Sequence, residues 1–225
     1  MKKYLIVVAG GKGIRMGQLI PKQFMLLCGR PVLFHTLEAF YNYDSAIEII
    51  LVLPEEQRAY WKEVCDSYSF PIPHQVVAGG GTRFHSVKNG LENVPKGSLV
   101  AIHDGVRPLV PLDVIERTFV KAEKEKAAYP VIPVTDSLRK YATNSGSIFV
   151  DRSQYCLVQT PQVFHSSLLK ESYNQSYQEA FTDDVSVVEA MGRCIPVMVE
   201  GSKENLKITT SSDLILVESL IKCKI

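Results

Sequence analysis

The sequence predicts an α/β fold with a mostly parallel central sheet flanked by helices. Apolar runs of strand length alternate with amphipathic segments of helical period through the first half of the chain, a pattern typical of right-handed crossovers between parallel strands. A length of 225 residues allows one full hydrophobic core and is too short for two ordinary domains. We therefore expect a single Rossmann-like domain over residues 1–225.

The composition is globular and the charges are nearly balanced. Hydrophobic residues make up 46% of the chain, and 25 basic residues stand against 24 acidic ones, for a formal net charge of +1. A general nucleic-acid binder usually carries a large basic excess, so we expect no nucleic-acid partner. No run approaches the ~18 apolar residues that a membrane span requires, so we expect no membrane partner either.

The cysteines and the first residues of the chain favour a cytoplasmic location. The five cysteines lie far apart and form no C-x-x-C pair, which argues against a zinc site or a disulfide framework and for a reducing compartment. The apolar run at 4–9 is too short for a signal peptide and ends in glycines, so it indicates a buried first strand.

A glycine-rich turn follows this first strand. Residues 7–17 read V-V-A-G-G-K-G-I-R-M-G, and P-K-Q follows at 21–23. Glycine has no Cβ and tolerates positive φ, so the backbone N–H groups of such a turn can approach an oxyanion closely. Arg15 and Lys22 lie here, and the first carboxylate of the chain is Glu38, so the local charge suits a polyphosphate. A plain strand-to-helix turn with solvated lysines is the alternative.

Two familiar glycine motifs do not match this turn. The dinucleotide fingerprint needs a glycine where Met16 stands, and the mononucleotide P-loop needs Ser or Thr where Gly13 stands. The string G-G-x-G-x-R-M-G instead resembles the signature loop of sugar-phosphate nucleotidyltransferases. Its P-K-Q ending is typical of the cytidylyltransferases that act on polyol phosphates.

The next segments continue the alternation of helices and strands. Residues 31–40 place apolar side chains on one helical face, and the apolar run 47–53 predicts a second strand. A further helix opens at Pro54 and is followed by a short strand at 75–78. These elements extend the expected parallel sheet.

A triple glycine at 79–81 ends this short strand and leads into T-R-F-H-S. The carboxyl ends of parallel strands meet at one edge of the sheet, where open α/β sheets bind ligands. A flexible turn with Thr82 as the N-cap of a helix is the simpler reading. In the cytidylyltransferases that the first loop resembles, the G-G-x-x-R-x-x-S segment contacts the cytosine, which implies base contacts for Gly80, Gly81 and Ser86.

The strand at 99–102 runs directly into H-D-G-V-R-P. Asp104 is then at the carboxyl end of a strand, where a carboxylate suits Mg²⁺ or a ribose hydroxyl. Alternatively, Asp104 caps the turn through the amides of Gly105 and Val106, and the two roles are compatible. The string H-D-x-x-R-P is a second block typical of the same cytidylyltransferases.

Residues 134–158 predict an inserted β-hairpin arm. A helix at about 111–125 and a strand at 127–133 come first, and the turn signal N-S-G then separates two extended segments. Such a hairpin is not needed by a doubly wound sheet.

The arm also predicts a partner. A two-stranded hairpin alone is marginally stable, so Ile148, Phe149 and Val150 need a cover, and we expect a second copy of the chain to provide it in a homodimer. The resemblance implies the same exchange of arms, with Ser137 and Arg152 reaching the partner's substrate phosphate.

Three more blocks complete the resemblance. T-P-Q contains Thr160, and T-D-D begins with Thr182, which would cap a helix with two acids in its first turn. N-x-K-x-T places Lys207 on a short apolar strand at 205–209, where a solvated side chain is the simpler reading. The resemblance implies that Thr182 faces the polyol and that Lys207 lies near the α-phosphate.

The blocks occur in order from Ala9 to about Asp213, so the whole chain is similar to the polyol phosphate cytidylyltransferases. The resemblance implies transfer of CMP from CTP to a polyol phosphate, with Mg²⁺ or another divalent cation as cofactor and pyrophosphate as the second product. The expected acceptor is 2-C-methyl-D-erythritol 4-phosphate, the alternative is ribitol 5-phosphate, and a non-catalytic CTP-binding protein is the alternative from another class.

The residues expected to act fall into four groups. A phosphate monoester has its second pKa near ~6, so the attacking phosphate needs cations around it more than it needs a general base. The catalytic group is Arg15, Lys22 and Lys207; the nucleotide contacts are Ala9, Gly10, Gly11, Gly13, Gly80, Gly81, Ser86, Asp104 and Gly105; the acceptor contacts are Asp104, Arg107, Ser137, Arg152, Thr160, Thr182 and Lys207; and the metal contact, direct or indirect, is Asp104.

Overall fold

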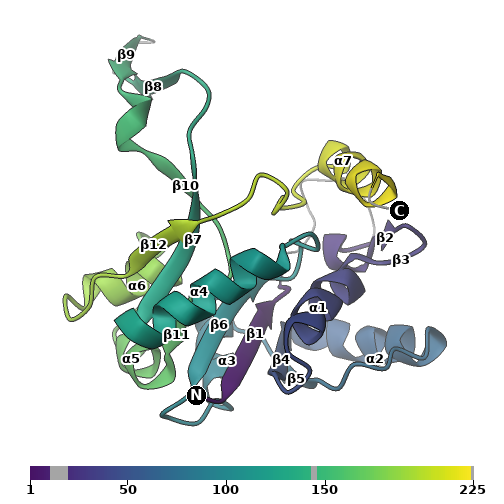
Figure 1. Cartoon of the computed structure of the whole chain (residues 1–225). Coiled ribbons are helices and arrows are strands. Elements are labelled where there is room, and N and C mark those ends of the chain that lie inside the picture. Colours follow the sequence, from purple (N-terminus) through teal and green to yellow (C-terminus); the bar gives the residue numbers. More distant parts are fainter. Residues whose placement is uncertain (11–19, 143–145, 224–225) are drawn as a thin grey trace.

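The computed structural model describes residues 1–10, 20–142 and 146–223 (Figure 1). Within these ranges an eight-stranded sheet has the order β10-β7-β11-β6-β1-β4-β5, with β12 paired to β7. Helices cover both faces of the sheet, as Figure 1 shows. The expected α/β class is confirmed.

The first half of the chain builds the parallel part of the sheet. Strand β1 (Lys3–Val8) lies between β4 (Glu48–Leu53) and β6 (Leu99–Asp104), and β5 (Gln75–Ala78) lies beyond β4. All of these pairings are parallel. The carboxyl ends of the strands therefore meet at one edge, as the spacing of the apolar runs predicts.

The second half adds strands of both directions. Strand β11 (Gln162–His165) runs antiparallel between β6 and β7 (Ala127–Pro133), while β12 (Val197–Glu200) runs parallel to β7 and β10 (Cys156–Val158) antiparallel to it. Only β10 and β11 are thus reversed among the described strands of this sheet, which confirms a mostly parallel arrangement. The insertion of β11 was not predicted.

Alternating side chains of β1 enter two hydrophobic layers. Leu5 and Val7 are fully buried on one face and Ile6 on the other, as the period of two in a strand requires. The helices on the first face are α1 (Val32–Tyr43), α2 (Arg58–Ser67) and α4 (Leu112–Glu125), and those on the second are α3 (Arg83–Leu91), α5 (Ser166–Ser172) and α6 (Asp184–Ala190).

The C-terminal segment passes over the carboxyl edge of the sheet. Residues 205–209, expected as a strand, form a loop. Ile208 N–H donates to Val106 O at 2.9 Å, while Asn205 is bonded to the side chain of Arg107 and, through its own side chain, to Thr160 O, in place of a neighbouring strand. Helix α7 (Ser211–Lys222) then packs Val217 against Ile208 and against Leu27 of β2 (Leu26–Leu27), a short strand paired with β3 (Arg30–Pro31). No helix in the described ranges is long and apolar enough to cross a membrane.

The predicted hairpin is present and projects away from the sheet (Figure 1). Strand β8 (Leu138–Tyr141) pairs antiparallel with β9 (Ser147–Val150), and Ala142 N–H donates to Gly146 O at 3.0 Å. Asn144 and Ser145 of the expected turn lie outside the described residues. Tyr141 and Phe149 are 93% and 75% exposed, so the described part of this chain leaves the apolar side of the arm uncovered.

Candidate active site

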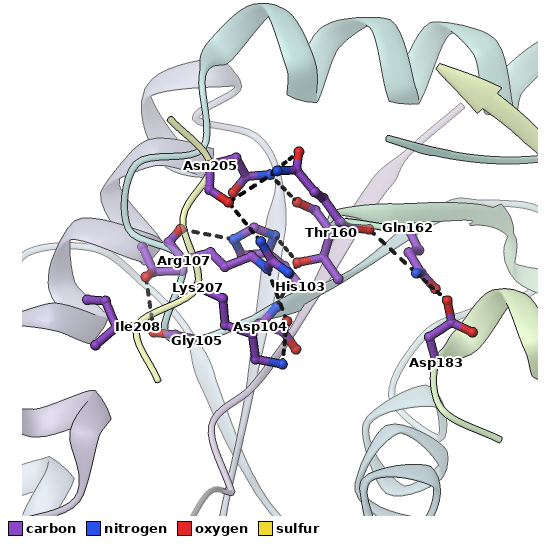
Figure 2. Close-up of polar contacts among 12 residues, drawn as sticks. His103, Asp104, Gly105, Arg107, Thr160, Gln162, Asp183, Asn205, Lys207 and Ile208 are labelled. Carbon is purple, nitrogen blue, oxygen red and sulfur yellow. Dashed lines mark hydrogen bonds and ion pairs between the residues drawn. The ribbon is translucent and has the colours of Figure 1, made fainter. Parts of the chain in front are cut away.

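Asp104 ends β6 and is the centre of a charged cluster at the carboxyl edge of the sheet. Its carboxylate Oδ2 lies 3.0 Å from Lys207 Nζ and 3.2 Å from Arg107 Nε, and its Oδ1 lies 4.0 Å from Arg83 Nε. Figure 2 shows Arg107 and Lys207 reaching Asp104 from different parts of the chain. Asp104, Arg107 and Lys207 were assigned to the acceptor site from the sequence, and the structure brings the three side chains together, while their roles stay predictions.

The charge of Asp104 is fixed by this surrounding. Burial alone would raise the pKa of the carboxyl, but the charges of Lys207, Arg83 and Arg107 hold it well below its usual range. Asp104 is therefore ionised at neutral pH. Arg83 also pairs with Asp184, so the cluster contains three cations and two carboxylates and keeps one net positive charge.

A directed hydrogen-bond chain holds the backbone of Asp104. Its N–H donates to Thr160 Oγ1 at 3.2 Å, and Thr160 Oγ1 lies 3.0 Å from His103 Nδ1. His103 Nε2 lies 3.2 Å from Arg107 O, and a carbonyl can only accept, so Nε2 carries the proton and Nδ1 accepts from Thr160. Burial lowers the pKa of His103 to about 4, which keeps this arrangement neutral.

Asn205 places Lys207 over the cluster. Asn205 is fully buried, its carbonyl accepts from Arg107 Nη1 at 2.7 Å, and its Nδ2 donates to Thr160 O at 2.7 Å (Figure 2). These bonds tie the C-terminal loop to the turns that follow β6 and precede β11. Lys207, two residues later, is 45% exposed and still pairs with Asp104, so it is more than a solvated surface lysine.

The first glycine loop is described only at its two ends. Gly11, Gly13 and Arg15 lie outside the described residues, so their expected roles stay predictions. At the near end, a Cβ on Gly105 would lie 2.9 Å from the Cβ of Ala9, so glycine is needed for the turn after β6 to approach this loop. Two of the expected nucleotide contacts therefore lie side by side.

Lys22 marks the far end of the first loop, in the short turn η2 (Lys22–Phe24). Its Nζ donates to Ile208 O at 3.4 Å, next to Lys207 in the sequence. The buried Gln23 donates to Ala9 O at 2.8 Å and thereby joins the two ends of the loop. The structure thus brings both expected catalytic lysines that it describes to one place, although they are 185 positions apart in the printed sequence.

The second glycine loop is held by its own side chains. The Ser86 hydroxyl donates to Thr82 O at 3.0 Å and accepts from Gly80 N–H at 3.1 Å, and Thr82 caps α3 by accepting from His85 N–H. A Cβ on Gly80 would lie 2.4 Å from that of His85, so this position requires glycine. Ser86 therefore shapes the loop, while its contact with a base, like that of Gly81, stays a prediction.

Helix α6 begins one residue later than the sequence predicted. Asp183, not Thr182, is the N-cap: its carboxylate accepts from Ser186 N–H at 2.9 Å, and the Ser186 hydroxyl completes a capping box. The reason is a side chain from another element, because Gln162 Oε1 accepts from the Asp184 amide at 3.0 Å and so fixes where the helix starts. Thr182 is left exposed and outside the helix.

Sequence reasoning missed a buried ion pair beside the cluster. Arg83 Nη2 lies 2.6 Å from Asp184 Oδ2, and the Tyr173 hydroxyl donates to Asp184 Oδ1 at 2.6 Å. Both residues lie in blocks already singled out in the sequence, Arg83 in G-G-x-x-R-x-x-S and Asp184 in T-D-D. Nothing in the sequence indicated that the two side chains pair.

Two expected acceptor contacts lie elsewhere. Ser137 and Arg152 are exposed on the arm, where the Arg152 guanidinium donates to Thr135 O. The arm points away from the sheet (Figure 1), so the structure does not bring these residues to the Asp104 cluster of the same chain.

Among the described residues there is no group of three or more His, Cys, Asp or Glu side chains that could hold a metal ion. Asp104 is the carboxylate at the centre of the cluster, and cations already contact its Oδ2. One carboxylate fits the way in which Mg²⁺ is commonly held, by one or two carboxylates together with substrate phosphates and water.

Comparison with known proteins defines the class to which this fold and cluster belong, the cytidylyltransferases. A family model described as 2-C-methyl-D-erythritol 4-phosphate cytidylyltransferase matches residues 4–223. The chain therefore belongs to the 2-C-methyl-D-erythritol 4-phosphate cytidylyltransferase family.

Individual relatives agree over their full lengths. Proteins with this name from Azobacteroides pseudotrichonymphae and Bacteroides thetaiotaomicron are 55% and 54% identical to the chain; each alignment covers 98% of the chain, with 99% and 100% of the relative. The crystal structure of the Thermus thermophilus protein of the same name is 30% identical with a TM-score of 0.79, over 99% of this chain and 100% of that one. A crystal structure of 4-diphosphocytidyl-2C-methyl-D-erythritol synthase from Anaerococcus prevotii is 28% identical in sequence with a TM-score of 0.82, and the match covers 98% of this chain and 96% of that one.

Proposed function

We propose that the chain transfers CMP from CTP to 2-C-methyl-D-erythritol 4-phosphate and releases pyrophosphate. The observation that carries this proposal is the meeting of Lys207 and Arg107 at Asp104, at the edge where parallel sheets bind ligands, with Lys22 bonded to the carbonyl of Ile208 next to Lys207. Family membership and the names of the relatives support the choice of substrates.

The chemistry asks mainly for positive charge in a fixed geometry. At neutral pH the acceptor phosphate is largely a dianion, so it attacks the α-phosphorus of CTP without a general base. Negative charge then builds up on the equatorial oxygens and on the leaving pyrophosphate. We assign Lys22, Lys207 and Arg15 to these oxygens, since cations held in place before the reaction stabilise charge that develops in it.

The nucleotide takes the edge formed by both glycine loops. The amides of Gly10, Gly11 and Gly13 would face the triphosphate, with Ala9, whose own N–H donates to Val52 O at 3.0 Å, as the strand end that adjoins them. The turn at Gly80 and Gly81 would face the base. Asp104 and Gly105 would lie at the ribose. Because Gly81 offers no side chain, we infer that backbone groups read the cytosine, with Ser86 holding them in place.

Mg²⁺ belongs to this proposal as a companion of the triphosphate. When bound, it would neutralise phosphate charge and so assist departure of pyrophosphate. Asp104 is the described side chain that would lie nearest to it, directly or through water. The chain's own part is to keep Asp104 ionised through Lys207, Arg107 and Arg83.

The acceptor site is proposed to be shared between two chains. Thr182, exposed just before α6, Thr160 and Arg107 would face the polyol from one chain. Ser137 and Arg152 would come from the arm of its partner. The exposed apolar side of the arm supports a homodimer, because Tyr141 and Phe149 gain burial only against another surface.

Pyrophosphate release tests the reaction itself. The purified chain is mixed with Mg²⁺, CTP and either 2-C-methyl-D-erythritol 4-phosphate or ribitol 5-phosphate, and the same pair is repeated with UTP. The proposal expects release with CTP and the methylerythritol phosphate at a rate well above the other pairs. Faster turnover of ribitol 5-phosphate would change the acceptor, and saturable CTP binding without turnover would favour a CTP-binding protein.

Arg152→Ala is expected to raise the KM for the polyol phosphate by about tenfold or more while kcat changes little. Hydrogen bonds to charged groups contribute roughly 1.5–3 kcal/mol, and this residue is assigned to a phosphate that is not transferred. Steady-state kinetics at saturating CTP measure it. Arg193→Ala is the control, since Arg193 is an exposed arginine away from the arm that pairs with Glu171. A KM equal to that of the unmodified chain would remove Arg152 from the acceptor site.

Phe149→Asp is expected to shift the chain from dimer to monomer and to lower activity with it. A charge on the apolar side of the arm costs burial in the dimer, whereas in the single chain Phe149 is exposed. Sedimentation velocity and activity over a dilution series measure this. Leu216→Asp, an equally apolar but unrelated exposed site on α7, is the control. An unmodified chain that stays folded and fully active as a monomer would contradict the shared site.

A further inference from the structure

Arg83 lies between two carboxylates that come from different parts of the fold. It is the first residue of α3 and follows directly on the second glycine loop. Its Nη2 lies 2.6 Å from Asp184 at the start of α6, and its Nε lies 4.0 Å from Asp104 at the end of β6. One guanidinium therefore joins the nucleotide loop, the central carboxylate and the segment that contains Thr182.

The Asp184 end of this link is rigid. Asp184 is fully buried, and each of its oxygens has a short partner, Arg83 at Oδ2 and the Tyr173 hydroxyl at Oδ1. Burial and the charge of Asp184 raise the pKa of Tyr173 well above its ordinary value, so the hydroxyl keeps its proton and donates. A buried carboxylate needs such partners, because leaving one unpaired is strongly destabilising.

Stacked rings make a second, independent connection between the same segments. Phe84, next to Arg83, stacks on Tyr173 with ring centroids 4.6 Å apart and on Phe181 at 5.7 Å. Residues 83–84 and 181–184 are therefore joined both by an ion pair and by an aromatic stack. Loss of one connection therefore leaves the other in place.

The Asp104 end of the link is open. At 4.0 Å the contact with Asp104 is longer than a hydrogen bond, and 29% of the Arg83 side chain is still exposed. The guanidinium is thus held by Asp184 and faces Asp104 without forming a hydrogen bond to it. The part of Arg83 that faces Asp104 is therefore accessible beside the charged cluster, which an ion pair that only stabilises the fold does not require.

We propose that Arg83 is a positioning residue that fixes the nucleotide loop, Asp104 and the Thr182 segment relative to one another, so that its loss weakens both substrates. This inference rests on the proposed function for the identity of the two substrates. Tyr173 contacts Asp184 and not Asp104, so loss of its hydroxyl acts on the acceptor side alone. The two changes therefore give different patterns.

Arg83→Lys and Tyr173→Phe test these patterns. Lysine keeps the charge but has one ammonium in place of a fork, so it cannot hold two carboxylates at once. Phenylalanine keeps the stack on Phe84 and removes a single bond. Arg193→Lys, which alters an exposed pair with Glu171, and Tyr68→Phe, which removes an exposed bond to Gly29 O, are the matched controls.

The measurements are the KM for each substrate, kcat, and the Kd for CTP by calorimetry without acceptor. Arg83→Lys is expected to raise the Kd for CTP and both KM values by about tenfold, the scale of one hydrogen bond between charged groups. Tyr173→Phe is expected to raise the acceptor KM severalfold and to leave the Kd for CTP unchanged. Both controls should match the unmodified chain.

A purely structural pair would lower the melting temperature or the active fraction and leave the CTP Kd and both KM values unchanged, which would overturn the proposal. Equal effects of Tyr173→Phe on both substrates would do the same. If Arg83→Lys does not fold, Asp184→Asn replaces it: the amide keeps the shape of the side chain but removes the negative charge that holds the Arg83 guanidinium, so the two-substrate pattern is expected again. An unmodified chain without turnover would refute the proposed reaction, while calorimetry with CTP would still decide whether Arg83 acts on nucleotide binding.

Discussion

Lys22→Ala is expected to lower kcat by about 100-fold, the scale on which a charge stabiliser held in place is lost. Lys22 lies at the end of the first glycine loop and donates to Ile208 O, which brings it next to the segment of Lys207. At this position it can stabilise the charge that develops on the α-phosphate and the leaving group. The KM for CTP should change less than kcat, because the charge in question is greatest in the transition state.

Single-turnover rates at saturating substrates measure this effect without interference from product release. Lys62→Ala is the control, since Lys62 is an exposed lysine on α2 that pairs with Asp66. An Lys22→Ala enzyme with an unchanged kcat would exclude Lys22 from the reaction. Lys22→Arg keeps the charge and should recover part of the rate if charge is what matters.

Lys207→Ala is expected to lower kcat/KM by roughly 100- to 1,000-fold, because it loses two functions. Lys207 is assigned to the α-phosphate and to the incoming phosphate, and it is also the cation at 3.0 Å from Asp104. Without it, one of the three charges that hold the pKa of Asp104 below its usual range is gone. With one cation fewer beside it, the Asp104 carboxylate repels the substrate phosphates more strongly.

Lys203→Ala gives a matched control for this second change, because Lys203 is an exposed lysine in the same C-terminal loop. Initial rates over a range of both substrates, with far-UV circular dichroism of each variant, separate loss of chemistry from loss of fold. A Lys207→Ala enzyme with kcat/KM within a few fold of the unmodified chain would mean that the ion pair with Asp104 is structural only.

The strands of the parallel half were predictable because each one is a short apolar run bounded by turn residues. Once β1, β4, β5 and β6 are parallel, their carboxyl ends have to meet, so Asp104 and the loops at Ala9 and Gly80 are brought to one edge by topology. Lys207 and Arg107 were predicted for this edge from the resemblance. Their contact with Asp104 agrees with it.

The errors all concern contacts between residues far apart in the sequence. Arg83 and Asp184 are 101 positions apart, and no local pattern pairs them. The start of α6 was misplaced because Gln162, from β11, bonds its first amides. The alternation of Leu206, Lys207 and Ile208 predicted a strand over residues 205–209. In the structure, the Asn205 side chain instead donates to Thr160 O, which holds the segment as a loop against that turn.

Asp104 also has a consequence for the enzyme between catalytic cycles. Three cations crowded into a small space would push one another outward if nothing negative lay among them, and water would enter. The carboxylate acts as an internal counterion that keeps Lys207, Arg107 and Arg83 gathered before any nucleotide arrives. Under the proposed function, these three cations are therefore gathered when the chain folds, before a nucleotide arrives.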